Sequence, residues 1–104
     1  MYNNKILIAD DDPNLIDYYI SIFEENEELD FFEEKNKISS QKFDLKLFND
    51  GKPLYEYFKK EYELGNKLPL VILDMRMPEM NGLETAQKLR EIDPDIIIVI
   101  VTAF

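Results

Sequence analysis

Three short runs of almost purely apolar residues constrain the fold of this chain most strongly. They are Ile6–Ala9, Leu70–Leu73 and Ile96–Val101. The run Ile6–Ala9 predicts a strand that is buried on both faces of a parallel sheet, and the other two runs predict further strands of that sheet. The first two runs lead directly into acid, at Asp10–Asp12 and at Asp74. Because the carboxyl ends of parallel strands meet at one edge of a sheet, we expect these carboxylates to converge there.

Helical segments separate the apolar runs. Asp12 and Pro13 predict the start of the first helix, since the aspartate can cap free amide groups and proline fits the first helical position. The apolar spacing predicts a second helix over about Pro53–Leu64 and a third helix that starts at Leu83 and stops at Asp93. The third helix is expected to turn four apolar residues toward the sheet: Leu83, Ala86, Leu89 and Ile92.

A further strand, residues 43–48, alternates apolar and polar side chains, as expected at the edge of a sheet. Strands and helices then alternate as β-α-β-α-β-α-β, which predicts a doubly wound, flavodoxin-like α/β fold with a parallel sheet. We expect residues 1–104 to form one domain. An acid-rich insertion at about 24–41 is either an extension of the first helix with a solvated loop or a partner-binding segment anchored by Phe31 and Phe32.

Composition excludes several kinds of function. The net charge of −10 argues against direct binding of nucleic acid, whose phosphates it would repel. The chain has no cysteine and no histidine, which excludes disulfides, thiolate ligands, imidazole catalysis and a typical zinc site. Ile96–Val101 is too short to span a membrane, and residues 1–9 lack the basic start and long apolar core of a signal peptide. We therefore expect a cytoplasmic protein.

The carboxylates at the strand ends remain as the candidates for chemistry. Like charges that lie close together raise each other's pKa or recruit a cation. Oxygen ligands of this kind suit a hard ion such as Mg²⁺. The sequence therefore predicts a divalent metal site built from Asp74 and the acids of Asp10–Asp12.

Three motifs resemble those of the receiver domains of two-component response regulators, and they occur in that family's order. They are ILIADDDP (residues 6–13), LDMRMPEMNG (73–82) and VIVTA (99–103). In the third motif, the small Ala103 resembles the residue that leaves room for a phosphoryl group. The resemblance implies a domain that takes a phosphoryl group from a sensor histidine kinase or a phosphotransfer protein. It implies a signalling switch rather than an enzyme with turnover.

The resemblance also implies a role for each residue of the site. Asp74 matches the phosphoacceptor. Asp10, Asp11, Asp74 and the backbone carbonyl of Arg76 match the groups that hold Mg²⁺. Among them, Asp11 matches the residue in direct contact with the ion, and Asp10 the residue that acts more through water. Thr102 matches the hydroxyl residue that hydrogen-bonds the phosphoryl group and shifts on phosphorylation.

The sequence departs from the family pattern after Thr102. Receivers have a fifth strand, preceded by a lysine that pairs with the phosphoryl group, and then a final helix, and these 104 residues contain none of the three after that position. We expect the sequence to be part of a longer receiver. The alternative is that another copy of the chain covers the strand Ile96–Val101, as a homodimer or by strand swapping.

Two other functions compete with this prediction. One is an interaction domain with the receiver fold that is not phosphorylated in this form, because the lysine is missing. The other is an Mg²⁺-dependent phosphatase with an aspartate nucleophile, of the haloacid dehalogenase type. Such phosphatases carry a general acid two residues after the nucleophile. Arg76 stands at that position, which argues against the phosphatase.

Overall fold

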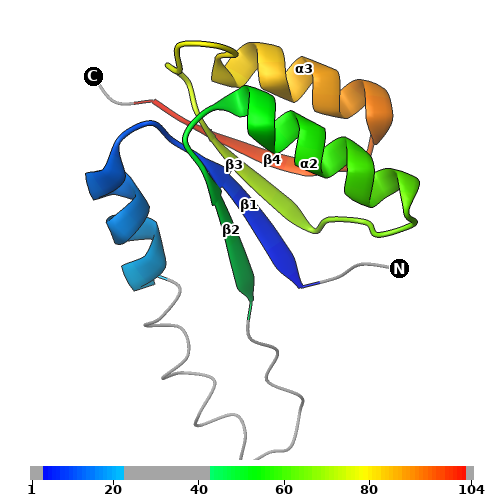
Figure 1. The fold of residues 1–104 in the computed structure, drawn as a ribbon, viewed down its shortest axis with the longest axis horizontal. Helices are drawn as coiled ribbons and strands as arrows, with labels where there is room; N and C mark the ends of the chain where they lie inside the picture. The colour runs from blue at the N-terminus through cyan, green and yellow to red at the C-terminus, as the bar shows by residue number, and fades with distance from the viewer. Residues whose placement is uncertain (1–3, 23–42, 103–104) are drawn as a thin grey trace, which may run out of the picture.

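The structure is a computed structural model, and it describes residues 4–22 and 43–102 of the chain. Within these residues, parallel strands form a sheet with the order β2-β1-β3-β4 (Figure 1). The predicted parallel α/β sheet is confirmed, and each strand begins and ends within one residue of its predicted bounds. The strands are β1 (Lys5–Ala9), β2 (Asp44–Phe48), β3 (Leu70–Asp74) and β4 (Ile97–Val101).

The two central strands, β1 and β3, are the most buried. This explains why their sequences do not alternate between apolar and polar residues. Their register runs from Ile6 opposite Leu70 to Ala9 opposite Leu73. The chain leaves β1 toward β2 on one side and returns to β3 on the other side, so β1 and β3 flank the topological switch point. Open α/β sheets bind their ligands at the carboxyl ends of such strands.

Helices cover both faces of the sheet, as expected for a doubly wound fold. α2 (Gly51–Glu63) and α3 (Gly82–Ile92) pack against each other on one face, and the helix formed by residues 13–22 lies on the other face (Figure 1). The first face carries the larger core, in which Phe58 and Leu89 are fully buried. The smaller core on the second face consists of Ile6, Ile8, Tyr19 and Ile72.

The helices differ from the prediction in two respects. α2 begins at Gly51, two residues before its predicted start, because the side chain of Asp50 caps the first turn. In α3, the predicted inward orientation of Leu83 was wrong, since its side chain is 51% exposed. Thr85 is buried in its place, because its hydroxyl donates a hydrogen bond of 2.7 Å to the carbonyl oxygen of Asn81 and needs no contact with water.

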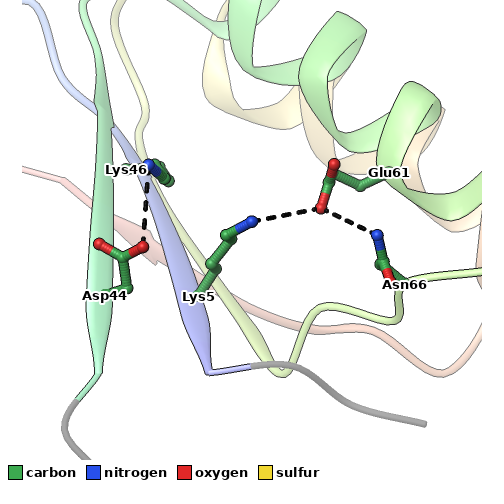
Figure 2. A network of polar contacts seen from close by, with 5 residues as sticks. All are labelled: Lys5, Asp44, Lys46, Glu61 and Asn66. Carbon is green, nitrogen blue, oxygen red and sulfur yellow. Dashed lines mark hydrogen bonds and ion pairs between the residues drawn. The ribbon is translucent and has the colours of Figure 1, made fainter. Parts of the chain in front are cut away.

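Ion pairs lie near the amino ends of β1 and β2, away from the carboxyl ends of the strands where the aspartates stand. The Nζ atom of Lys5 lies 3.6 Å from Oε1 of Glu61 in α2, and that oxygen accepts a hydrogen bond of 3.4 Å from the side chain of Asn66 (Figure 2). Lys46 and Asp44 form a separate ion pair of 3.7 Å within β2. The contact between Lys5 and Glu61 ties the start of β1 to the end of α2.

The outer strands of the sheet are β2 and β4. The prediction that β2 lies at an edge is therefore confirmed. On β4, the side chains of Ile97 and Val99 are 61% and 45% exposed. Because side chains alternate along a strand, both lie on the same face of the sheet. β4 thus presents apolar side chains to solvent along an outer edge.

None of the helices in the described residues combines the length and the apolar character needed to cross a membrane. Several parts of the sequence prediction lie outside the described residues. These are the insertion at about 24–41 with Phe31 and Phe32, and Ala103.

Candidate functional site

Three carboxylates meet at the carboxyl ends of β1 and β3. Asp10 and Asp11 directly follow β1, and Asp74 is the last residue of β3. Each offers an oxygen atom, and these oxygens all lie within 4.8 Å of one another. The register of the sheet produces the cluster, because Ala9 lies opposite Leu73 and the next residue of each segment is an aspartate. The structure thus brings these acids together, as the sequence predicts.

Asp10 is the most buried member of the cluster, with 2% of its surface exposed. Its Oδ1 accepts a hydrogen bond of 2.9 Å from the backbone N–H of Asp12, whereas its buried Oδ2 has no hydrogen-bond partner. Burial raises the pKa of Asp10, and the charges of Asp74 and Asp11 raise it further, while the bond from Asp12 acts in the opposite direction. A buried carboxylate oxygen without a partner destabilises a fold unless a proton or a cation compensates it.

Two neighbouring groups are perturbed in the same direction. Burial raises the pKa of Asp74, and the charge of Asp11 adds to this effect, although a hydrogen bond from the backbone N–H of Arg76 opposes it. Burial also raises the pKa of the Tyr19 hydroxyl, with further contributions from Asp10 and Asp74. Burial and the neighbouring negative charges therefore act in the same direction on the pKa of all three groups.

The carboxylates line an open cavity of about 460 Å³. Arg76 and Thr102 lie on its wall, and both are exposed. Asp12 lines the cavity as well, but it is not part of the three-acid cluster. Its side chain accepts a hydrogen bond of 2.9 Å from the backbone N–H of Asn14, which confirms its predicted role as a helix cap. The cavity thus collects all the predicted site residues: Asp10, Asp11, Asp74, Arg76 and Thr102.

The donor set of this cavity fits a hard divalent cation. Carboxylate oxygens are the ligands that Mg²⁺ prefers in proteins. The buried Oδ2 of Asp10 lacks a partner among the protein atoms, and a cation beside it would satisfy that oxygen. The same cation would oppose the effects of burial and of repulsion between the acids, which together raise the pKa values of Asp10 and Asp74.

Residues 34–104, which are more than half of the chain, match the family model of the response regulator receiver domain. The chain belongs to this family. The response regulator receiver protein CpdR of Brucella abortus is 28% identical to this receiver over 100 residues. The aligned region covers 96% of this receiver and 67% of CpdR. Receiver domains are signalling domains rather than enzymes with turnover.

Solved structures share the fold of this receiver. A chain of the CheX–CheY–BeF3–Mg²⁺ complex from Borrelia burgdorferi has a TM-score of 0.71 and 21% identity, with 96% of this receiver and 62% of that chain covered. The response regulator TrrA from Thermotoga maritima, in complex with Mg²⁺ and beryllium fluoride, has a TM-score of 0.60 and 26% identity. That match covers 98% of this receiver and 71% of the TrrA chain. The flavodoxin-like α/β fold is confirmed, and the receiver spans about two thirds of the length of these relatives.

The loop after β3 is fixed at its first residue. The backbone N–H of Met75 donates to the carbonyl oxygen of Val101, and the carbonyl oxygen of Met75 accepts from the backbone N–H of Gly82, both at 3.0 Å. A Cβ atom at position 82 would collide with the carbonyl oxygen of Asp74 and would lie 3.0 Å from Cα of Met75. Glycine therefore allows α3 to begin directly behind the acid at the end of β3.

One residue that contacts this loop was missed by the sequence prediction. Asp50 is 6% exposed, and its carboxylate accepts hydrogen bonds from the backbone N–H groups of Glu79 and Met80, at 3.0 and 2.9 Å. Burial acts to raise the pKa of Asp50, but the hydrogen bonds from the backbone outweigh it and the pKa is lowered. In the sequence, Asn49–Gly51 is typical of a turn, and an aspartate just before an apolar helical stripe is the one signal of a cap.

Proposed function

We propose that this receiver accepts a phosphoryl group on Asp74 with Mg²⁺ bound beside it, and that this modification shifts a conformational equilibrium that controls an output or a partner. One observation carries the proposal: the buried Oδ2 of Asp10 has no partner within a cluster of three carboxylates. Acids with a purely structural role are expected to have their buried oxygens hydrogen-bonded by the protein. The structure of TrrA with Mg²⁺ and beryllium fluoride gives further support.

Four groups of the chain would hold the ion. They are the carboxylates of Asp10, Asp11 and Asp74 and the backbone carbonyl of Arg76. Asp11 is exposed, which suits direct contact with the ion. The resemblance to receiver domains gives Asp10 a contact that runs more through water. When bound, Mg²⁺ offsets the repulsion between the carboxylates and the oxygens of the phosphoryl group.

Asp74 is the nucleophile of the proposed transfer. One of its carboxylate oxygens forms a bond to phosphorus while the bond from phosphorus to an imidazole nitrogen of a phosphohistidine breaks. The electron pair of the broken bond stays on that nitrogen. The carboxylate must be ionised for this step, and hydrogen bonds from the backbone N–H groups of Arg76 and Met75 favour the ionised form.

Thr102 is the proposed donor to the transferred group. This threonine directly follows β4 and lines the cavity, where its hydroxyl can hydrogen-bond a phosphoryl oxygen. Asp74 pairs with Val101 in the sheet. Thr102 is the next residue after Val101, so the phosphoacceptor and the hydroxyl come from the ends of two neighbouring strands. A movement of Thr102 toward the phosphoryl group would change the surface at the end of β4.

The partner of this transfer is a sensor histidine kinase or a phosphotransfer protein. A second copy of the chain is a further proposed partner, along the outer edge of β4 where Ile97 and Val99 are exposed. We expect residues 1–104 to act as one receiver domain in the cytoplasm. The net charge of −10 argues against nucleic acid binding by this segment.

Phosphorylation in vitro tests the proposal. The chain is incubated with Mg²⁺ and a small-molecule phosphodonor, and mass spectrometry of its peptides locates the acyl phosphate. We expect the label on Asp74 and its loss in Asp74→Asn. Asp44→Asn is the matched control, because Asp44 is an exposed aspartate at the opposite end of the sheet. That variant should be labelled like the wild type.

Other outcomes would support the competing functions. A label on a different residue would overturn the assignment of Asp74. If Mg²⁺ binds but no label forms, the interaction domain becomes the better description. Continuous release of phosphate from a small phosphoester would indicate the phosphatase.

A further inference from the structure

We infer that Asp50 is a positioning residue for the metal and phosphoryl site, because it holds the loop of residues 75–81 that presents the Arg76 carbonyl. This inference rests on the proposed function, in which that carbonyl is a ligand of Mg²⁺. Asp50 itself lies between β2 and α2, whereas the loop joins β3 to α3. The contact therefore joins two segments that are distant in the sequence.

Both oxygens of the Asp50 carboxylate are used. Oδ1 accepts hydrogen bonds from the backbone N–H groups of Met80 and Lys52, at 2.9 and 3.3 Å. Oδ2 accepts one from the backbone N–H of Glu79, at 3.0 Å. A helix cap requires a single acceptor atom, and the bond to Lys52 satisfies that requirement. The other two bonds fasten the loop, and they explain why a carboxylate, with two acceptor atoms, is buried here.

Thr85, near the start of α3, forms hydrogen bonds to the same part of the loop. The hydroxyl of Thr85, which is fully buried, lies 2.7 Å from the carbonyl oxygen of Asn81 and 3.3 Å from that of Met80. A Cβ atom at position 51 would collide with Oγ1 of Thr85 and would lie 2.5 Å from the carbonyl oxygen of Met80. Gly51 therefore lets α2 approach, so that Met80 is held through its N–H by one helix start and through its carbonyl by the other.

These contacts determine how Arg76 is presented. Met75 is fixed by backbone hydrogen bonds to β4 and α3, and Met77 is buried in the core with 7% exposure. Pro78 has a restricted φ angle, and the next two residues are bound by Asp50. Arg76 is exposed between these anchors. The direction of its carbonyl is therefore set by the anchored residues on either side, and release of the Asp50 anchor would loosen it.

Asp50→Asn separates the two roles of the residue. Asparagine caps helices as well as aspartate does, and its one oxygen can keep the bonds from Met80 and Lys52. Its amide nitrogen would then face the N–H of Glu79, so that two donors oppose each other. We expect the α2 helix to persist, hydrogen exchange of the Glu79 amide to accelerate, and Mg²⁺ to bind about tenfold more weakly. Calorimetric titration with Mg²⁺ and amide exchange measured by NMR give these readouts.

Two further variants make the test specific. Asp93→Asn is the matched control, because Asp93 is a buried aspartate that accepts a backbone hydrogen bond from Asp95 at the far end of α3. Its Mg²⁺ affinity should stay within about twofold of the wild type, since its contacts do not reach the loop. Thr85→Val removes the grip on the Met80 carbonyl at nearly constant volume and should weaken Mg²⁺ binding in the same direction as Asp50→Asn. It also keeps the test decisive if Asp50→Asn fails to fold.

The outcomes distinguish this inference from the proposed function. If the wild type binds Mg²⁺ and Asp50→Asn binds it equally well, the positioning role of Asp50 is wrong while the proposed function stands. Equal losses of affinity in Asp50→Asn and Asp93→Asn would also overturn the role, because they would indicate general destabilisation. A wild type that binds no Mg²⁺ would instead overturn the proposed metal site, and the inference with it.

Discussion

Asp10 carries a charge in the interior that the surrounding protein does not compensate. Because burial and the charges of Asp74 and Asp11 raise its pKa, the folded state binds a proton at this carboxylate more readily than the unfolded state does. The resulting loss of stability is fully present above the raised pKa. It disappears as the pH falls below the ordinary value of 3.8. The ionised site therefore weakens the metal-free fold at neutral pH.

Replacement of Asp10 by asparagine should reverse this effect. We expect Asp10→Asn to raise the free energy of unfolding by about 1 kcal/mol at pH 7 in a chelator, and the gain should shrink as the pH is lowered. The same variant should gain less stability from added Mg²⁺ than the wild type. Urea unfolding at several pH values, with and without Mg²⁺, measures both effects.

Asp12→Asn is the control for the loss of one negative charge beside Asp10. Asparagine preserves the helix cap, so stability should change by less than about 0.5 kcal/mol. If Asp10→Asn were no more stable than the wild type in chelator, the ionised carboxylate of Asp10 would not destabilise the metal-free fold.

At the scale of elements, the site depends on how closely α3 approaches the end of β3. Gly82 permits this approach, since a side chain there would meet the backbone of Asp74 and Met75. Gly65 has a different role, because its φ of 88° is a left-handed conformation and nothing lies within 4 Å of a Cβ atom built there. Substitutions at the two glycines therefore separate the effect of close packing from the effect of backbone conformation.

Gly82→Ala should destabilise the fold by about 2 kcal/mol through overpacking and should weaken Mg²⁺ binding by about tenfold, because Asp74 is displaced. Gly65→Ala should destabilise by about 1 kcal/mol through its backbone conformation and leave Mg²⁺ affinity unchanged. Urea unfolding and calorimetric titration of both variants provide the comparison. Equal Mg²⁺ affinities in the two variants would show that the contact behind Asp74 does not shape the site.

The sequence predicts those parts of this architecture that depend on local patterns. The apolar runs predict the strands, and the parallel arrangement of β1 and β3 then predicts that Asp10 and Asp74 are neighbours. The role of Asp50 could not be predicted in this way, because its partners Glu79 and Met80 are 29 and 30 residues away along the chain. Leu83 was wrongly turned inward for a different reason. The apolar spacing does not reveal that the Thr85 hydroxyl can bond to the carbonyl oxygens of Asn81 and Met80, four and five residues before it.

At the scale of the whole molecule, β4 is an outer strand of the sheet that the described residues form, and it exposes the side chains of Ile97 and Val99. Edge strands of this kind pair readily with other chains. We therefore expect the chain to self-associate as its concentration rises. Val99→Lys should weaken this association at least about tenfold, which corresponds to about 1.4 kcal/mol. Light scattering across a dilution series measures it.

Leu64→Lys provides the control for this prediction, because Leu64 is 66% exposed but lies at the end of α2 rather than on the sheet. It adds the same charge and removes a comparable apolar side chain. A monomeric wild type at every concentration, or an equal effect of both lysines, would contradict association through β4.

The Oδ2 atom of Asp10, which lacks a hydrogen-bond partner, matters for any redesign of this chain that considers only folding stability. A design procedure that ignores ions would score that atom as a defect and replace the residue among the first. Its product would be a more stable protein that, if the proposed function holds, binds Mg²⁺ less well. Proteins that share this sheet can be separated by the same feature. Those with an unsatisfied carboxylate oxygen at the end of the first strand are expected to need a cation there. Those in which that oxygen is absent or hydrogen-bonded are expected to use the fold for another purpose.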